Sequence, residues 1–369
     1  MQSKPLCPRA TIPICSLWLL LACSWAAGGL VGAEPVLSSR FVGAPGCASS
    51  SCHGGAGEKR SQWVSWNAAD VHRRANTTLS ARRSVQIAEA AKLGDPAASP
   101  RCTVCHAPFA DVPATLRVNA LDRTDGVSCE TCHGPAEPYL RSHWRPDFTR
   151  VDRTLAGLRD LSNLYVRANT CVACHQNVDF DLQLAGHPEL IFELDGQTRS
   201  EPRHWKEAKD FSGAQAWFVG QAVALREMAW QSGKTDQKAH PNVGRRDLEV
   251  GWLVRKAAKA AGFDGEDPDA LAKLAAATRW KPAATAAILK ALASSAGEFR
   301  ANPAKSGRPE IRAERLVLAL DRLLAASPPE TEKKVETELA DLFRRAQSRS
   351  DFSPADFSAA LEKLAAKLD

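Results

Sequence analysis

The chain has 369 residues, of which 44% are hydrophobic and 24% charged, and these are ordinary proportions for a globular protein. They exclude a disordered chain, a collagen and a coiled coil. The formal net charge of +6 is small for this length and no long basic run occurs, which argues against a nucleic-acid partner. The unusual counts are 11 Cys, 9 His and 10 Trp against 2 Met.

The first 33 residues have the pattern of a secretory signal peptide. Lys4 and Arg9 are the only charges before Glu34, and an apolar stretch over residues 12–23 is followed by small residues. A basic start, a short apolar core and small residues before the cleavage site are typical of such signals. We expect residues 1–33 to be removed and the mature protein to be periplasmic or otherwise exported.

The end of the apolar stretch offers a second processing route. Leu20-Leu21-Ala22-Cys23 resembles a bacterial lipobox, which would leave Cys23 as a lipidated N-terminus. A third interpretation is an uncleaved anchor, because the apolar and small residues together are just long enough to span a bilayer. No later segment has that length and hydropathy, so we expect membrane contact only through a lipid on Cys23.

The eight cysteines after the signal form four pairs, and a histidine directly follows each pair. Two residues separate the cysteines in three of the pairs, and four residues separate them in the first. The predicted attachment cysteines are Cys47, Cys52, Cys102, Cys105, Cys129, Cys132, Cys171 and Cys174. The predicted proximal metal ligands are His53, His106, His133 and His175.

C-x-x-C-H is the attachment motif of c-type haem, in which two thiols add to the porphyrin vinyl groups and the histidine binds the iron. A zinc ribbon does not require a histidine after each cysteine pair. A disulfide framework, which an exported chain could use, also leaves the four histidines unexplained. The sequence therefore predicts four covalently attached haem c groups, the first through a motif with a longer spacer.

The remaining histidines are candidates for the second axial ligands. Four are predicted to serve: His72, His143, His187 and His204. His240 lies in a polar segment and is expected to be solvated. Met228 is the only thioether after the initiator, so at most one haem can be His/Met and most are expected to be bis-His and low in potential. Nearby tryptophans are expected on the porphyrins or in ordinary core: Trp63, Trp66, Trp144 and Trp205.

The predicted fold class is mainly α with few strands. Residues 34–209 are expected to form a tetrahaem cytochrome domain in which the haems are the core, since so short a chain cannot build a separate core for each. Residues 210–369 are expected to form an all-α domain with loops at 262–267 and 302–308. Its predicted helices are Ala214–Gln231, Asp247–Ala261, Pro268–Thr278, Pro282–Ser294, Glu310–Ala326, Pro329–Gln347 and Pro354–Lys367.

Two serines are predicted to begin helices in this domain. Ser327 and Ser353 each precede proline, with an acidic residue three positions later, which is typical of an N-cap. Apolar residues recur at helical spacing and predict buried faces. The three stripes are Leu316, Leu320, Leu323 and Leu324; Val335, Leu339, Leu342 and Phe343; and Phe357, Leu361, Leu364 and Leu368.

Three segments together resemble the tetrahaem cytochrome c-554 family and related exported multihaem cytochromes. They are Gly46-Cys47…Cys52-His53-Gly54, Gly126-Val-Ser-Cys-Glu-Thr-Cys-His-Gly134, and Ala185-Gly-His-Pro with Pro202-Arg-His-Trp205. The resemblance covers roughly residues 42–230. It implies a helical, haem-packed fold, periplasmic electron transfer, and bis-His haems with one haem five-coordinate.

By position, the resemblance makes His53, His106, His133 and His175 proximal ligands and His72, His143 and His187 distal candidates. Relatives often have a histidine where this chain has Phe180, so one haem here lacks that partner or takes another such as His204. Which histidine serves which haem stays open.

Two functions of different class follow. The features favour electron transfer between exported or membrane-bound redox partner proteins, because this accounts for every mature cysteine. The alternative is an enzyme in which one open haem iron acts on nitric oxide, nitrite or hydroxylamine. No catalytic residue is singled out, and no C-x-x-C-K motif occurs. A third interpretation makes the C-terminal helices a docking module.

Overall fold

The computed structural model describes residues 39–234, 246–300, 308–347 and 349–368. Within these ranges the chain is helical, and its only extended pairing is an isolated bridge between Phe41 and Arg117, so the mainly-α prediction is confirmed. Residues 38–369 form one compact unit. The predicted signal peptide, Cys23 and His240 lie outside the described residues. No helix in the described ranges has the length and apolar character needed to span a bilayer.

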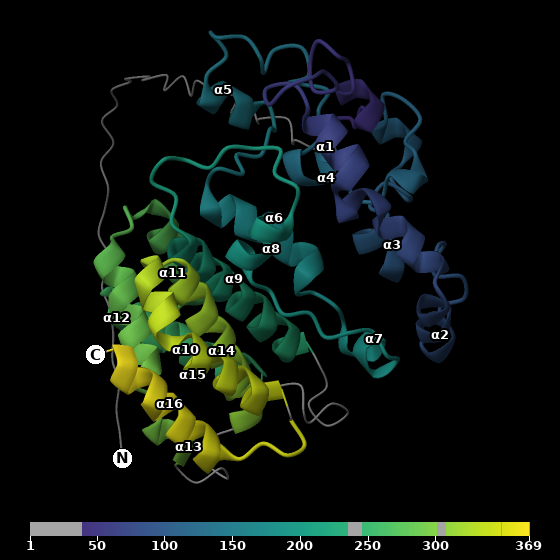
Figure 1. Cartoon of the computed structure of the whole chain (residues 1–369). Helices are drawn as coiled ribbons and strands as arrows, with labels where there is room; N and C mark the ends of the chain where they lie inside the picture. Colours follow the sequence, from purple (N-terminus) through teal and green to yellow (C-terminus); the bar gives the residue numbers. More distant parts are fainter. Residues whose placement is uncertain (1–38, 235–245, 301–307, 348, 369) are drawn as a thin grey trace, which may run out of the picture. The chain divides into compact units, whose positions relative to one another are not determined.

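Short helices and connecting loops make up residues 39–212 (Figure 1). Three attachment motifs close a helix, with the histidine as its last residue: α3 (Pro100–His106), α4 (Cys129–His133) and α6 (Leu164–His175). The first motif begins at the end of the 3-10 helix η2 (Ala44–Cys47). The other elements are α1 (Gln62–Ala69), η3 (Val71–Ser80), α2 (Arg82–Ala90), η4 (Ala114–Leu116), η5 (Arg123–Asp125), α5 (Arg150–Leu155), α7 (Phe180–Leu184) and α8 (Leu194–Ser200).

The hydrophobic clusters of this first part are small. One is built on Val42, Ala136 and Tyr139, and a second on Ile87, Val178 and Leu182. Such small clusters bury too little apolar surface to hold a fold of this length, which agrees with an interior that a prosthetic group has to complete.

Long helices make up the rest of the chain (Figure 1). The seven predicted helices are all present, with bounds that agree to within three residues. A short additional helix, α13, follows α12. The elements are α9 (Gly213–Lys234), α10 (Arg246–Ala261), α11 (Pro268–Ala277), α12 (Pro282–Ala293), α13 (Gly297–Arg300), α14 (Pro309–Ala325), α15 (Pro329–Gln347) and α16 (Pro354–Leu368).

The three predicted apolar stripes form the core of these helices. Every residue of the stripe on α14 is fully buried, and so are Val335 and Leu342 on α15 and Phe357, Leu361 and Leu364 on α16. Phe343 and Leu368 pack against the same core while partly exposed. Its members also come from α6 and from the residues around α8, and Met228 of α9 is one of them, 5% exposed.

The two predicted serine caps have different outcomes. Ser353 precedes α16, and its hydroxyl accepts a hydrogen bond from the Asp356 amide at 3.3 Å. Ser327 does not cap α15, because that helix begins at Pro329 and Pro328 separates the two. The Ser327 hydroxyl instead donates to the Leu323 carbonyl at the end of α14. The predicted loop at 262–267 is present, whereas 302–307 lie outside the described residues.

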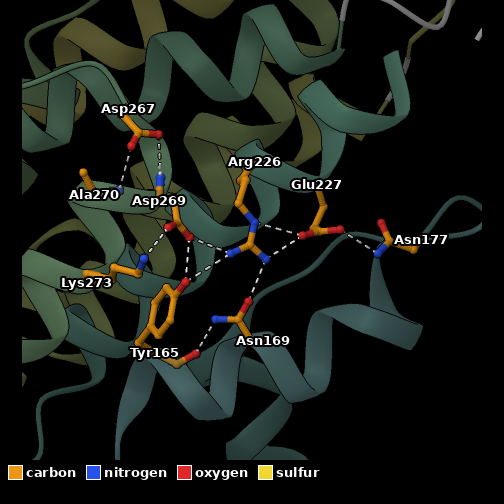
Figure 2. Close-up of polar contacts among 9 residues, drawn as sticks. All are labelled: Tyr165, Asn169, Asn177, Arg226, Glu227, Asp267, Asp269, Ala270 and Lys273. Atoms are coloured by element: carbon orange, nitrogen blue, oxygen red, sulfur yellow. Dashed lines mark hydrogen bonds and ion pairs between the residues drawn. The ribbon is translucent and has the colours of Figure 1, made fainter. Parts of the chain in front are cut away.

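A polar network joins the helix of the fourth motif to the C-terminal helices (Figure 2). The Arg226 guanidinium of α9 donates to Asn169 of α6 and to Asp269 of α11, both at 2.6 Å. Tyr165 of α6 donates to the same Asp269 oxygen at 2.7 Å. Hydrogen bonds from Lys273 and Tyr165 lower the pKa of Asp269, which stays ionised in the network. The fourth motif is thereby held against α9 and α11.

Candidate metal centre

A cavity of about 640 Å³ lies among the attachment motifs. A volume of this size is in the range of sites that enclose a cofactor-sized ligand. Three of the four motifs contribute to its wall, together with three of the predicted distal histidines. These residues are Cys47, Cys52, His53, Cys129, Cys132, His133, Cys171, His72, His143 and His204.

Two glycines allow ligand-bearing segments to approach. Gly126 has φ +61°, and a Cβ placed there would lie 2.5 Å from the His72 carbonyl oxygen, so only glycine fits where η3 crosses the third motif. The next residue, Val127, donates its N–H to that carbonyl at 2.9 Å. Gly186, with φ +106°, turns the chain after α7 and places His187 beyond the helix end.

Three motif histidines each face a second imidazole. The ring centres lie 6.0 Å apart for His53 and His143, 5.9 Å for His72 and His175, and 6.5 Å for His106 and His187. Two metal–nitrogen bonds of about 2 Å, plus the distance from each nitrogen to its ring centre, give a separation of about 6 Å for two imidazoles on one metal ion. The three pairs have the spacing that a shared iron requires.

Five of these six histidines have Nδ1 beside an oxygen that can accept its proton. The partners are Gln62 Oε1 for His53 at 3.0 Å, Asp70 for His72 at 3.1 Å, the Thr78 hydroxyl for His106 at 2.8 Å, the Tyr139 carbonyl for His143 at 2.9 Å and the Pro188 carbonyl for His187 at 2.9 Å. An Nδ1–H held in this way orients the ring and leaves Nε2 for a metal. At His175, Nδ1 lies 3.3 Å from the side-chain amide nitrogen of Gln197.

His133 and His204 differ from these pairs. Within the described residues, no imidazole makes a ring contact of this kind with His133. Burial lowers the pKa of His133 to about 4, so its ring stays neutral, as a metal ligand must be. His204 lines the same cavity, and its Nδ1 is buried without a hydrogen-bond partner among the described residues. Among the described residues, the third motif therefore has no second imidazole in the ring contact that the other three motifs show.

Cysteines of different motifs lie against one another. The thiols of Cys47 and Cys129 are close enough to shift each other's pKa, which places the first motif beside the third. The thiols of Cys105 and Cys174 act on each other in the same way, which places the second motif beside the fourth. The eight cysteines are unpaired.

A third pair of cysteines lies close together and links the third motif to the fourth. The pKa of the Cys171 thiol is raised to about 12; burial is the largest cause, and the nearby Cys132 is the next. Cys132 belongs to the third motif and Cys171 to the fourth. The four motifs therefore neighbour one another in the order first, third, fourth, second.

Basic side chains add positive charge to the wall of the cavity. They are Arg150, Arg153, Arg159, Arg167 and Lys206. Arg167 forms an ion pair with Glu207 at 2.7 Å, and Arg159 donates to the carbonyl of Thr131 at 2.6 Å. The Nε of Arg153 is buried with no partner among the described residues. Guanidinium groups in this position suit carboxylates of a bound ligand.

The structure shows which of the remaining predicted residues line the cavity. Trp63, Trp66 and Trp205 line the cavity, whereas Trp144 does not and is 70% exposed. Met228 lies in the core of the C-terminal helices and lines none of the cavity wall. His187 and the second motif pair with each other but do not line this cavity.

The structure fits covalently attached haem. Each motif offers two thiols and one imidazole, three motifs have a second imidazole at the spacing for one iron, and the cavity wall carries guanidinium groups suited to haem propionates. The residues that sequence reasoning missed are the Nδ1 partners. Asp70 lies two residues before His72, so its contact with that ring could have been predicted from the sequence. Gln62, Thr78 and Gln197 reach the histidine rings only because of the fold.

Residues 47–134 match the family model of cytochrome c554 and c-prime. The match spans the first three attachment motifs and His72. No curated protein and no solved structure gives a match. The family match supports a c-type cytochrome that binds haem c covalently and takes part in electron transfer.

Proposed function

We propose, with the cytochrome c554 family match of residues 47–134 as the premise, that the chain is an exported tetrahaem c-type cytochrome. It passes electrons between exported or membrane-bound redox partner proteins. The observation that supports this most strongly is the set of three histidine pairs at 5.9 to 6.5 Å, each joining a motif histidine to a second imidazole.

The proposed metal ligands follow from those pairs. His53 with His143, His106 with His187, and His175 with His72 each hold one iron, and His133 holds the fourth. Haem supplies the one-electron chemistry, and bis-imidazole ligation gives it a low potential compared with His/Met ligation. The chain's own part is to orient five of the rings through Nδ1. Burial lowers the pKa of His106, His133 and His175, which favours their neutral rings, whereas the hydrogen bond to Asp70 raises the pKa of His72.

The order of the four motifs in space defines the proposed path of the electrons. The contacts from the first motif to the third, the third to the fourth and the fourth to the second make a single line with the first and second motifs at its ends. Electrons would enter near one end of this line and leave near the other. Redox partners therefore dock near His53 or near His106.

The alternative function is an enzyme, and the environment of His133 is the observation that favours it. Among the described residues His133 alone would hold the iron of the third motif, and such an iron would have a position for a small nitrogen compound such as nitric oxide, nitrite or hydroxylamine. His204, whose Nδ1 is buried without a partner among the described residues, lines the same cavity and can hold a proton or orient such a ligand. The neighbouring motifs would deliver the electrons.

The other parts of the chain have proposed roles as well. Residues 1–33 direct export, with cleavage before Glu34 or lipidation of Cys23 as the two processing routes. Residues 210–369 form a helical domain that supports the fourth motif through the Arg226 network and offers a docking surface. Deletion of these residues tests docking: lost partner binding with an unchanged haem spectrum supports it.

Ligand binding to the ferric and to the ferrous protein distinguishes an electron carrier from an enzyme. The full holoprotein is titrated with nitrite and with nitric oxide while its electron paramagnetic resonance and absorption spectra are recorded. A carrier shows no response, or a response without turnover. A high-spin signal that disappears on ligand addition in wild type, together with reduction of the ligand by the pre-reduced protein, identifies the enzyme.

A further inference from the structure

Two carboxylates are buried beside α8 with oxygen atoms that have no partner. Asp195 is 3% exposed, and its Oδ1 makes no hydrogen bond to a described residue. The Oε2 of Glu193, at the N-terminal end of the same helix, is also closed to solvent and unpartnered. Their neighbours Phe192 and Leu194 are each 1% exposed and belong to the main hydrophobic core. Two charges in such surroundings are costly unless they are neutralised.

The groups that face this pair do not neutralise it. From α9, Gln221 donates an amide hydrogen to Oε1 of Glu193 at 3.1 Å. From α14, Arg322 forms an ion pair with its neighbour Asp321, and Arg315 lies 3.4 Å from Glu189.

Within α8 itself, Arg199 is the other charge that acts on Asp195. Arg315 shares Glu189 with Arg246 and Arg349, and its Nε has no hydrogen-bond partner among the described residues. Burial raises the pKa of both carboxylates more than the arginines lower it, Arg322 acting on both and Arg315 on Glu193. A proton on the pair cancels the charge that remains.

Helix α8 connects this pair to the fourth motif. The side-chain amide of Gln197 lies 3.3 Å from Nδ1 of His175. Thr198 and Glu201, further along the helix, line the haem cavity. Asp195 precedes Thr198 by three residues, which corresponds to about 4.5 Å along a helix axis. The carboxylate pair is therefore within electrostatic range of an iron held by His175.

We propose that Glu193 and Asp195 together form a redox-linked proton site for the haem held by His175. The inference rests on the proposed function, because it requires a haem at the fourth motif. When an electron from an external reductant reaches that iron, one proton from solvent adds to a carboxylate oxygen of the pair. The proton leaves a hydronium ion or water molecule of the solvent, so one O–H bond breaks there as one forms on the carboxylate, and the net charge of the interior is unchanged.

The coupling follows from electrostatics. An added negative charge on the iron favours the protonated carboxyl, and by linkage the protonated carboxyl favours the reduced iron equally. Burial raises the pKa of Glu193 to about 8 and that of Asp195 to about 6. The pair therefore changes its proton occupancy between about pH 6 and pH 8, where an exported protein works.

The test is a spectroelectrochemical titration of the full holoprotein between pH 5 and pH 9. In wild type one midpoint potential falls as the pH rises through the window, by at most about 59 mV for each tenfold change in proton activity. In Glu193→Gln and in Asp195→Asn that slope is reduced, and in the double variant it is lost. The matched control is Glu332→Gln, an exposed glutamate of α15, which keeps the wild-type slope.

A second readout does not depend on a variant that folds. The infrared difference spectrum between reduced and oxidised wild type gains the C=O stretch of a protonated carboxyl, and this band shifts in heavy water. If either single variant folds, its band is weaker or absent.

Four haems with pH-independent potentials and no carboxyl band overturn this inference and leave the proposed function standing. Variants that keep the wild-type slope overturn it as well. A chain that attaches no haem overturns both.

Discussion

His143 is near the third motif in the sequence but near the first motif in the fold, so replacing it tests which of the two motifs it serves. His143 follows the third motif by ten residues, yet its ring lies 6.0 Å from that of His53 in the first motif, nearly parallel at 18°. Replacement of His143 by alanine therefore removes the second ligand of the iron held by His53 and leaves the iron held by His133 as it was.

The expected magnitude comes from counting ligand pairs. Three of the four motif histidines face a second imidazole in the described structure, so under the proposed ligand assignment we expect one iron in four to be high-spin in wild type. In His143→Ala the high-spin share doubles to two in four. Loss of an axial imidazole does not detach the haem, because the thioether bonds remain.

The assay is quantitative electron paramagnetic resonance of the ferric holoprotein, with the haem content of each sample measured in parallel. Trp144→Phe is the matched control, since Trp144 follows His143 in the chain, is 70% exposed and does not line the cavity. His204→Ala is expected to keep the wild-type share, because His204 faces no second imidazole in a ring contact among the described residues. An unchanged spectrum in His143→Ala, or a doubled high-spin share in His204→Ala, would refute the assignment of ligand pairs.

Three further predictions concern stability and potential. Leu320→Ala removes a fully buried side chain from the core of α14 and is expected to cost about 2–5 kcal/mol in the free energy of unfolding, measured by denaturant titration; a cost below 1 kcal/mol would contradict the packing. Asp269→Asn should destabilise the protein at pH 7, because the folded state lowers the pKa of this carboxyl. The difference from wild type should shrink as the pH falls below about 4, the pKa of an unfolded aspartate, and be lost only in stronger acid that protonates the folded state; a difference that grows in acid would contradict the sign. Gln62→Ala removes the hydrogen bond at Nδ1 of His53, which makes the ligand less basic, so the midpoint potential of that haem should rise; an unchanged or lower potential would contradict the role of Gln62.

The sequence was sufficient to predict the C-terminal helices because their signals are local. Prolines in the first turn and apolar residues at helical spacing mark their ends and buried faces, and the structure agrees with the bounds closely. The failure at Ser327 is also local in origin. Two prolines follow it, and the helix starts at the second, so the serine hydroxyl is taken by the preceding helix.

In the part of the chain with the attachment motifs, the sequence predicts individual residues but not how they are paired in space. The motifs identify the thiols and the proximal histidines, because covalent attachment fixes their spacing. Ligand pairs could not be predicted, since His72 lies opposite His175 across about a hundred residues of chain, and only the fold brings them together. The domain boundary near residue 210 stays a prediction, and the core that joins Val172 and Leu194 to α9 shows how closely the two sides pack.

The central claim is that four haems are covalently attached to one chain. It is tested most directly by the intact mass of the purified holoprotein under denaturing conditions, after expression with a cytochrome c maturation system. The account predicts the mass of the processed chain plus four haems, and the loss of one haem when both cysteines of one motif, such as Cys102 and Cys105, are replaced by serine. A wild-type mass with fewer than four haems would contradict it.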